Sequence, residues 1–181
     1  MDRRQEKTQA IIIEAFIQLL MKKSYNKITV KEIIDTANIG RSTFYNHYET
    51  KDELLEALCD HLFDHVFAKN NQFNKDAKHI ITHMLYHLQE DHIVLTKLLV
   101  SESSELFVKY FKQYLCRMEM NALIEPFLEA YPDIPKDCIQ NHIVTSFVSM
   151  VQYWLANKMK QTPEEISHYF VQMVLKEKTA N

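Results

Sequence analysis

Residues 29–55 read TVKEIIDTANIGRSTFYNHYETKDELL, and this stretch decides the fold of the N-terminal part of the chain. It contains the same helix-start pattern twice, Thr29 followed by Glu32 and Thr50 followed by Glu53. In such a capping box the hydroxyl and the carboxylate each accept a hydrogen bond from a free amide at the helix start. The pattern therefore predicts a short helix from about residue 30 and a longer one from about residue 51.

Between these two starts, the sequence Asn38-Ile39-Gly40 interrupts the apolar spacing of the first short helix. Asparagine and glycine are the residues that most readily take the left-handed conformation of a sharp turn. A third short helix is expected from Arg41 to about Tyr48. Two short helices joined by a tight turn are typical of a helix-turn-helix, whose second helix enters the major groove of DNA.

The side chains of this third helix suit a DNA groove. Arg41, Ser42 and Thr43 lie at its N-terminal end, where a recognition helix approaches base edges, and Arg41 can contact a guanine through two hydrogen bonds. The hydrogen-bond donors of residues 45–48 can reach phosphate oxygens, whereas Phe44 is expected to pack inward. The alternative is a packing corner with an incidental basic face. The predicted DNA contacts are Thr29, Arg41, Ser42, Thr43, Tyr45, Asn46, His47, Tyr48 and Lys51.

The formal net charge of the 181 residues is −3, which would argue against a nucleic-acid partner if the charge were evenly spread. Its distribution is uneven. Residues 1–51 hold nine Lys and Arg against six Asp and Glu, a balance of +3, and residues 52–181 hold twelve against eighteen, a balance of −6. The basic end is therefore the end with the helix-turn-helix pattern, as phosphate binding requires.

The composition predicts an all-α fold, because one glycine and four prolines are too few for the tight turns of a sheet-rich chain. Apolar spacing and caps indicate about nine helices. Pro126 is expected to bend or split the helix that contains it. We expect a DNA-binding domain over 1–50 and a helical regulatory and dimerisation domain over 51–181, joined through the long fourth helix. The helices beyond the fourth are predicted over 76–89, 93–101, 104–130, 136–160 and 163–177.

The sequence favours a cytoplasmic protein without catalytic activity. Its three cysteines, Cys59, Cys116 and Cys138, are widely separated and form no C-x-x-C pair, as is typical of a reducing compartment. We find no signal peptide and no apolar run long enough to span a bilayer. A Gly-rich phosphate loop and a nucleophile elbow are also missing, so we expect neither an enzyme nor a cofactor.

Residues 29–55 resemble the DNA-binding domain of the TetR-type repressors, above all over the run TFYNHYETKDELL of residues 43–55. The resemblance implies a homodimer whose two recognition helices enter successive major grooves of a pseudo-palindromic operator. It also implies a pocket in the C-terminal bundle for a small-molecule effector that releases the repressor. Two residues depart from the family pattern: Asn38 stands where glycine is usual, and Gly40 where a small hydroxyl residue usually caps the recognition helix.

The last two predicted helices resemble the dimerisation helices of this family, and the region from Trp154 to Glu165 looks like a branch common in Gram-positive bacteria. Large apolar side chains on these helices suit an isologous interface. Other aromatic residues are candidates for the effector pocket, although a place in the core is the simpler explanation. The predicted interface is Phe147, Met150, Val151, Tyr169, Phe170, Met173 and Val174, and the predicted pocket is Tyr86, Phe107, Phe111 and Trp154.

Two sets of histidines are spaced four residues apart, so each set could face a metal ion from one helix. Solvated histidines are the simpler explanation, because no thiolate pair completes either set. We therefore predict no metal site. The two sets are His61 with His65, and His79, His83 and His87.

Taken together, these features predict a TetR-type transcriptional regulator with double-stranded DNA, a second copy of itself and an unknown small molecule as partners. A second possibility stays open, namely a helical adaptor of the same fold that activates or co-activates through a protein partner. The two differ in whether the chain alone binds DNA of a specific sequence.

Overall fold

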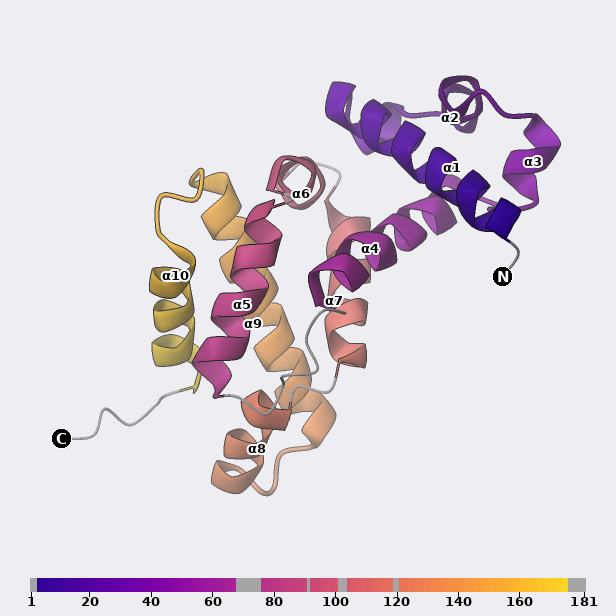
Figure 1. The fold of residues 1–181 in the computed structure, drawn as a ribbon. Coiled ribbons are helices and arrows are strands. Elements are labelled where there is room, and N and C mark those ends of the chain that lie inside the picture. Colours follow the sequence, from indigo (N-terminus) through magenta and orange to yellow (C-terminus); the bar gives the residue numbers. More distant parts are fainter. Residues whose placement is uncertain (1–2, 68–75, 91, 101–103, 119–120, 176–181) are drawn as a thin grey trace.

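The computed structural model describes residues 3–67, 76–90, 92–100, 104–118 and 121–175, and within these ranges it contains ten α-helices and no strand (Figure 1). The predicted all-α fold is confirmed. No helix in the described ranges is long and apolar enough to cross a membrane. A 3-10 turn, η1 (Tyr25–Lys27), follows α1, and a π-helical turn, η2 (Val171–Leu175), continues α10. The helices are α1 (Arg3–Lys22), α2 (Val30–Ala37), α3 (Arg41–Tyr45), α4 (Lys51–Phe67), α5 (Ala77–Glu90), α6 (His92–Leu99), α7 (Glu105–Arg117), α8 (Asn121–Ala130), α9 (Lys136–Ala156) and α10 (Pro163–Phe170).

Helices α1, α2 and α3 form a small head at the N-terminal end of the molecule (Figure 1). Phe16 of α1, Ile33 of α2 and Phe44 of α3 are fully buried and hold the three helices together. The capping box at Thr29 is formed as predicted. The Glu32 amide donates to Thr29 Oγ1 at 3.3 Å, and the Thr29 amide donates to Glu32 Oε2 at 2.9 Å. Helix α2 therefore begins where the sequence indicates.

The turn between α2 and α3 depends on Asn38, which has φ 51° and ψ 48° in the left-handed region. Asparagine tolerates this conformation better than most residues. Gly40 has φ −73° and ψ 151°, an extended conformation that any residue adopts. A Cβ added at Gly40 would meet Thr43 Oγ1 at an ordinary 3.5 Å. The prediction for Asn38 is thus confirmed, whereas the expectation that Gly40 also supplies a left-handed residue is wrong.

The long helix α4 leads from the head into the body, where it packs against α5 and α7 (Figure 1). Its first turn is capped by Thr50, whose Oγ1 accepts a hydrogen bond from the Glu53 amide at 3.1 Å. The Glu53 carboxylate accepts from the Glu49 amide at 2.6 Å. The second capping box is therefore only half formed, although α4 begins where it predicts.

The body is built around a continuous apolar core to which α4 to α10 all contribute. Phe63 of α4 stacks on Phe111 of α7 with 4.4 Å between the ring centroids. Trp154 of α9 is fully buried, and its Nε1 donates to the backbone oxygen of Gln161 at 2.8 Å. Helix α10 begins with a complete capping box at Thr162, as predicted, and lies against α5 and α9 on the side away from the head (Figure 1). The head meets the body through α4 and through contacts between α1 and α6.

The helix predicted over 104–130 is two helices, which raises their number from the expected nine to ten. The interruption follows α7, where Met118 is extended with ψ 138°. Helix α8 continues through Pro126, so the break does not lie at the proline. The helix predicted over 163–177 is regular only to Phe170 and then passes into η2.

Candidate nucleic-acid interface

Helix α3 divides its side chains between the core of the head and the solvent. Phe44 is fully buried, and its ring meets the ring of Tyr45 edge-on with 5.5 Å between centroids. The polar side chains of α3 and of the turn after it are exposed or partly buried on the other side of the helix. We call this set the α3 edge: Arg41, Ser42, Thr43, Tyr45, Asn46 and His47.

Arg41 is held in place by an aromatic neighbour. Its guanidinium lies over the ring of Tyr45, with 5.8 Å from Cζ to the ring centroid. Such stacking leaves the planar donor fork of arginine available to a base or a phosphate. The pair borders a hollow of about 340 Å³ between α2 and α3, whose lining includes the exposed Lys31. Lys31, in the first turn of α2, was not among the predicted contacts.

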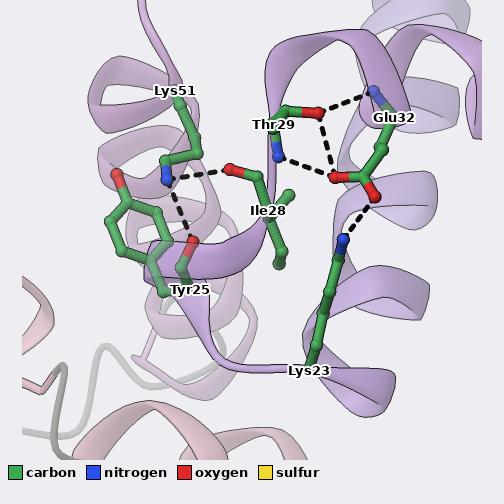
Figure 2. A network of polar contacts seen from close by, with 6 residues as sticks. All are labelled: Lys23, Tyr25, Ile28, Thr29, Glu32 and Lys51. Carbon is green, nitrogen blue, oxygen red and sulfur yellow. Dashed lines mark hydrogen bonds and ion pairs between the residues drawn. The ribbon is translucent and has the colours of Figure 1, made fainter.

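The sequence predicts a phosphate contact for Lys51, the first residue of α4. In the structure its side chain binds the backbone of the segment between α1 and α2 (Figure 2). Its Nζ donates to the backbone oxygens of Tyr25 at 2.9 Å and Ile28 at 3.0 Å, and burial lowers the pKa of Lys51. The Tyr25 hydroxyl donates to the Asp52 carboxylate, and burial, together with this bond, raises the pKa of Tyr25. The partly exposed ammonium uses two of its three donors inside the protein, so we expect Lys51 to position the start of α4 against η1, and its contact with a phosphate stays a prediction.

A second polar network ties the end of α1 to the start of α2 (Figure 2). The Glu32 carboxylate accepts hydrogen bonds from Lys23 Nζ and from the amide and hydroxyl of Thr29. These bonds, that of Lys23 foremost, lower the pKa of Glu32 to about 2. Thr29 is exposed, but its hydroxyl serves this network. Its observed role is to begin α2, and its contact with DNA stays a prediction.

The sequence also predicts a phosphate contact for Tyr48, but this side chain is only 6% exposed. It lies beside Phe44 with 6.1 Å between ring centroids, and burial raises the pKa of its hydroxyl. The physical reason is that α3 ends at Tyr45, earlier than expected, so the chain turns and brings Tyr48 back into the core of the head. Tyr48 is therefore corrected from a DNA contact to a core residue.

Comparison with known families explains why this head is attached to a helical body. Residues 12–58 match the family described as bacterial regulatory proteins, tetR family. Residues 75–176, more than half of the chain, match the TetR-type family described as a transcriptional regulator C-terminal region. The chain belongs to the TetR family. It is a helix-turn-helix, DNA-binding regulator of transcription and not an enzyme.

Relatives of this TetR-family chain are also regulators. A TetR transcriptional regulator from Streptococcus agalactiae 2603V has 35% sequence identity and a TM-score of 0.74, with 96% of each chain covered. The dhaKLM operon transcriptional activator DhaS of Lactococcus lactis is 31% identical over 97 residues, which span 54% of this chain and 51% of DhaS. An HTH-type transcriptional regulator of Staphylococcus aureus is 25% identical over 182 residues, 94% of each chain. The match to DhaS thus covers about half of that protein, and the other two cover nearly the whole length.

The aromatic residues predicted for the effector pocket do not all lie together. Phe107, Phe111 and Trp154 are fully buried in the core of the TetR-family body. Tyr86 is 47% exposed, and its hydroxyl donates to the Glu164 carboxylate of α10. Tyr86 is therefore corrected to a surface contact between α5 and α10. For the other three, core packing is observed and a contact with an effector stays a prediction.

A hollow that sequence reasoning missed lies between α8, α9 and η2. It measures about 560 Å³, and its mostly apolar lining includes Phe127, Ile134 and Met173, with Cys138 and His142 as polar members. This volume is within the range of small-molecule sites. The available signal was the spacing of Cys138 and His142, one helical turn apart on a face of α9 that the core does not use.

The residues predicted for the dimer interface divide into two groups. Phe147, Val151 and Phe170 point into the core of their own chain and are at most 3% exposed. A side chain buried within one subunit cannot also form the surface between two, so these three are corrected to core residues. Tyr153 of α9, which was not among the predicted interface residues, is exposed. The predicted members that remain exposed or partly buried are Met150, Tyr169, Met173 and Val174.

One histidine set brings two rings together. The Nε2 atoms of His83 and His87 on α5 lie 3.2 Å apart. In the other set, His61 is exposed, and the side chain of His65 lies outside the described residues. The described part of the chain contains no group of three or more His, Cys, Asp or Glu side chains placed to hold a metal ion.

Proposed function

We propose that this chain is a homodimeric repressor that binds a pseudo-palindromic operator and leaves it when a small-molecule effector binds. The observation that supports this most is the α3 edge. A cation and several hydrogen-bond donors lie on the outside of a helix whose other side is locked into the head by the fully buried Phe44. A rigid helix with exposed donors is what base reading in a major groove requires.

Within the α3 edge, we assign base reading to Arg41, because its guanidinium can donate to both O6 and N7 of guanine. Ser42, Thr43, Asn46 and His47 are assigned to bases and phosphates near the same helix end. We further propose a DNA-binding domain in residues 1–50 and a regulatory domain in 51–181. The separate family matches, over 12–58 and 75–176, support two parts, although the first match extends eight residues beyond residue 50.

The proposed dimer forms through the exposed sides of α9, α10 and η2. Tyr153 is 54% exposed and Met173 is 63% exposed, and Tyr169 is exposed as well. Large apolar side chains at the surface are suited to an isologous interface, in which the same patch of each subunit meets its copy. A two-fold dimer then sets its heads about 34–36 Å apart, or a multiple of that, to reach successive half-sites.

We place the effector in the hollow between α8, α9 and η2, whose apolar lining favours an apolar ligand. Met173 borders both this hollow and the proposed dimer face. A ligand that fills the hollow would therefore change how the subunits pack and how far apart the heads lie. Release follows if the ligand binds more tightly to the arrangement that no longer fits the operator.

A second candidate function is activation through a protein partner. It is favoured by the match to DhaS, a protein named as a transcriptional activator, over about half of this chain. In this case the apolar surface of α9 and α10 would serve a partner protein. Operator binding by the α3 edge is common to both candidates, so they differ only in what the bound chain does to transcription.

Selection of bound duplexes from random DNA, followed by transcription in vitro on a template with the selected site, tests the proposal. We expect an inverted repeat and a loss of transcript when the chain alone is added. Failure to select a sequence, or selection of a site without two-fold symmetry, would contradict the proposed dimeric reading. A gain of transcript would contradict repression and favour the second candidate, activation.

A further inference from the structure

We propose that His83 and His87 of α5 form a two-histidine site for a divalent transition-metal ion. The two residues are one helical turn apart, and their Nε2 atoms face each other at 3.2 Å. Their ring centroids are 4.4 Å apart, and the ring planes are inclined at 57°. The rings thus converge on one point beside α5 and do not spread into solvent.

The separation of the two nitrogens also allows both of them to bind one ion. Two nitrogens 3.2 Å apart, each about 2.0–2.1 Å from one ion, subtend roughly 100° at that ion, close to the tetrahedral angle of zinc. Without a metal, one Nε2–H donates to the other Nε2 at this distance, as a hydrogen bond between two neutral imidazoles. In the proposed site a metal ion replaces that proton and binds both nitrogens, and the displaced proton moves to Nδ1 of the same ring or to solvent.

Glu90 supplies the support that metal-binding histidines usually have. Its Oε2 lies 3.3 Å from Nδ1 of His87, on the side of the ring away from Nε2. A carboxylate in this place accepts a hydrogen bond from Nδ1–H, which favours the tautomer whose Nε2 lone pair is free to bind a metal. Glu90 is thus a positioning residue for His87 and not itself a ligand.

The site is also held in shape by the packing of α5. Thr82 donates to Ser167 Oγ of α10 at 2.7 Å, and Tyr86 donates to the Glu164 carboxylate. The His87 side chain is only 17% exposed, so its ring is confined but still reached by solvent. Because the described residues provide no third protein ligand, water completes the coordination. Imidazole nitrogens select Zn²⁺, Ni²⁺ or Cu²⁺, whereas Mg²⁺ and Ca²⁺ require oxygen ligands.

Calorimetric titration of the untagged full-length chain tests the site, with Zn²⁺, Cu²⁺ and Mg²⁺ as the probes. We expect one Zn²⁺ or Cu²⁺ per chain, tighter binding of Cu²⁺ than of Zn²⁺, and no binding of Mg²⁺. His83→Gln and His87→Gln should each abolish this binding. Glu90→Gln, which changes an exposed side chain and leaves both ligands in place, should weaken it by about tenfold.

The matched control is His79→Gln, which removes the other histidine of the same row, one turn earlier on α5. It should leave the affinity unchanged, and so should His168→Gln on α10. Circular dichroism of each variant checks the fold, and the Cu²⁺ electron paramagnetic resonance spectrum of the wild type should show coupling to two nitrogens. Binding that survives the His83→Gln/His87→Gln double variant, or that is lost in His79→Gln, would overturn the proposal. So would a wild-type chain that takes up neither ion.

Discussion

The ammonium of Lys51 lies 4.0 Å from the centroid of the Tyr25 ring and donates a hydrogen bond to the Tyr25 backbone oxygen at 2.9 Å. Through a further bond to the oxygen of Ile28 at 3.0 Å, the first residue of α4 fastens the segment between α1 and α2 (Figure 2). We therefore expect Lys51 to affect DNA binding indirectly, because it fixes how the head sits on α4.

Replacing Lys51 by methionine should lower the free energy of unfolding by about 1–2 kcal/mol, since two charge-assisted hydrogen bonds of a partly exposed group are lost. Chemical denaturation measures this loss. Operator affinity should fall, but the slope of its logarithm against the logarithm of salt concentration should stay as in the wild type. Lys27→Met, which changes an exposed lysine of η1, is the control for stability. A salt slope reduced by about one unit in Lys51→Met would instead support a direct contact between Lys51 and a DNA phosphate.

Phe44 and Tyr45 are neighbours with opposite surroundings, and their alanine variants should fail in opposite ways. Phe44→Ala removes a fully buried ring from the head and should cost about 3–5 kcal/mol of unfolding free energy. Tyr45→Ala changes an exposed ring and should cost less than about 1 kcal/mol. Yet it should weaken operator binding, because Arg41 loses the surface on which it lies. Thermal unfolding and fluorescence anisotropy with labelled operator separate the two effects.

The Glu32 network predicts a pH-dependent stability. The folded-state pKa of about 2 is below the usual 4.5, so the contribution is complete above pH 4.5 and is lost as the pH falls towards 2. The melting temperature of Glu32→Gln should therefore lie below that of the wild type at pH 6, and the gap should close on acidification through this window. Glu125→Gln, an exposed carboxylate of α8, should show no such gap. A gap that stays constant down to pH 2 would refute the assignment.

The proposed dimer face predicts that charge at its exposed apolar residues separates the subunits. A chain carrying Tyr153→Asp and Met173→Asp should elute as a monomer of unchanged helicity, because two carboxylates would be buried without partners in the isologous contact. Light scattering during size-exclusion chromatography measures the mass. Ile93→Asp, which places the same charge at a side chain of α6 that is 53% exposed, should leave the dimer intact. A dimer that persists in the double variant would show that the interface lies on another face of the subunit.

Local signals in the sequence predicted the helix starts and the α3 edge well. The capping boxes at Thr29 and Thr162 involve residues three positions apart, and both begin a helix in the structure. The left-handed turn at Asn38 and the buried Phe44 likewise follow from preferences within one short segment. Such features are decided by nearby residues, so one sequence is enough to predict them.

Features that depend on distant residues were missed. The partners of Lys51 lie 26 and 23 residues earlier in the chain, and no spacing rule connects them. Apolar periodicity indicates that α9 has a buried side, but it cannot tell whether its own body or a second subunit covers Phe147 and Val151. The break at Met118 was missed for another reason, since residues 118–120 contain neither glycine nor proline.

The most direct test of base reading by the α3 edge is the affinity of Arg41→Ala for the selected operator and for random duplex of equal length, at one salt concentration. Loss of a bidentate contact to one base pair should weaken operator binding by about 1–3 kcal/mol and change random-DNA binding far less. The ratio of the two affinities should therefore fall by roughly fivefold to a hundredfold. Equal losses on both duplexes would contradict the account, because Arg41 would then contact only the phosphate backbone.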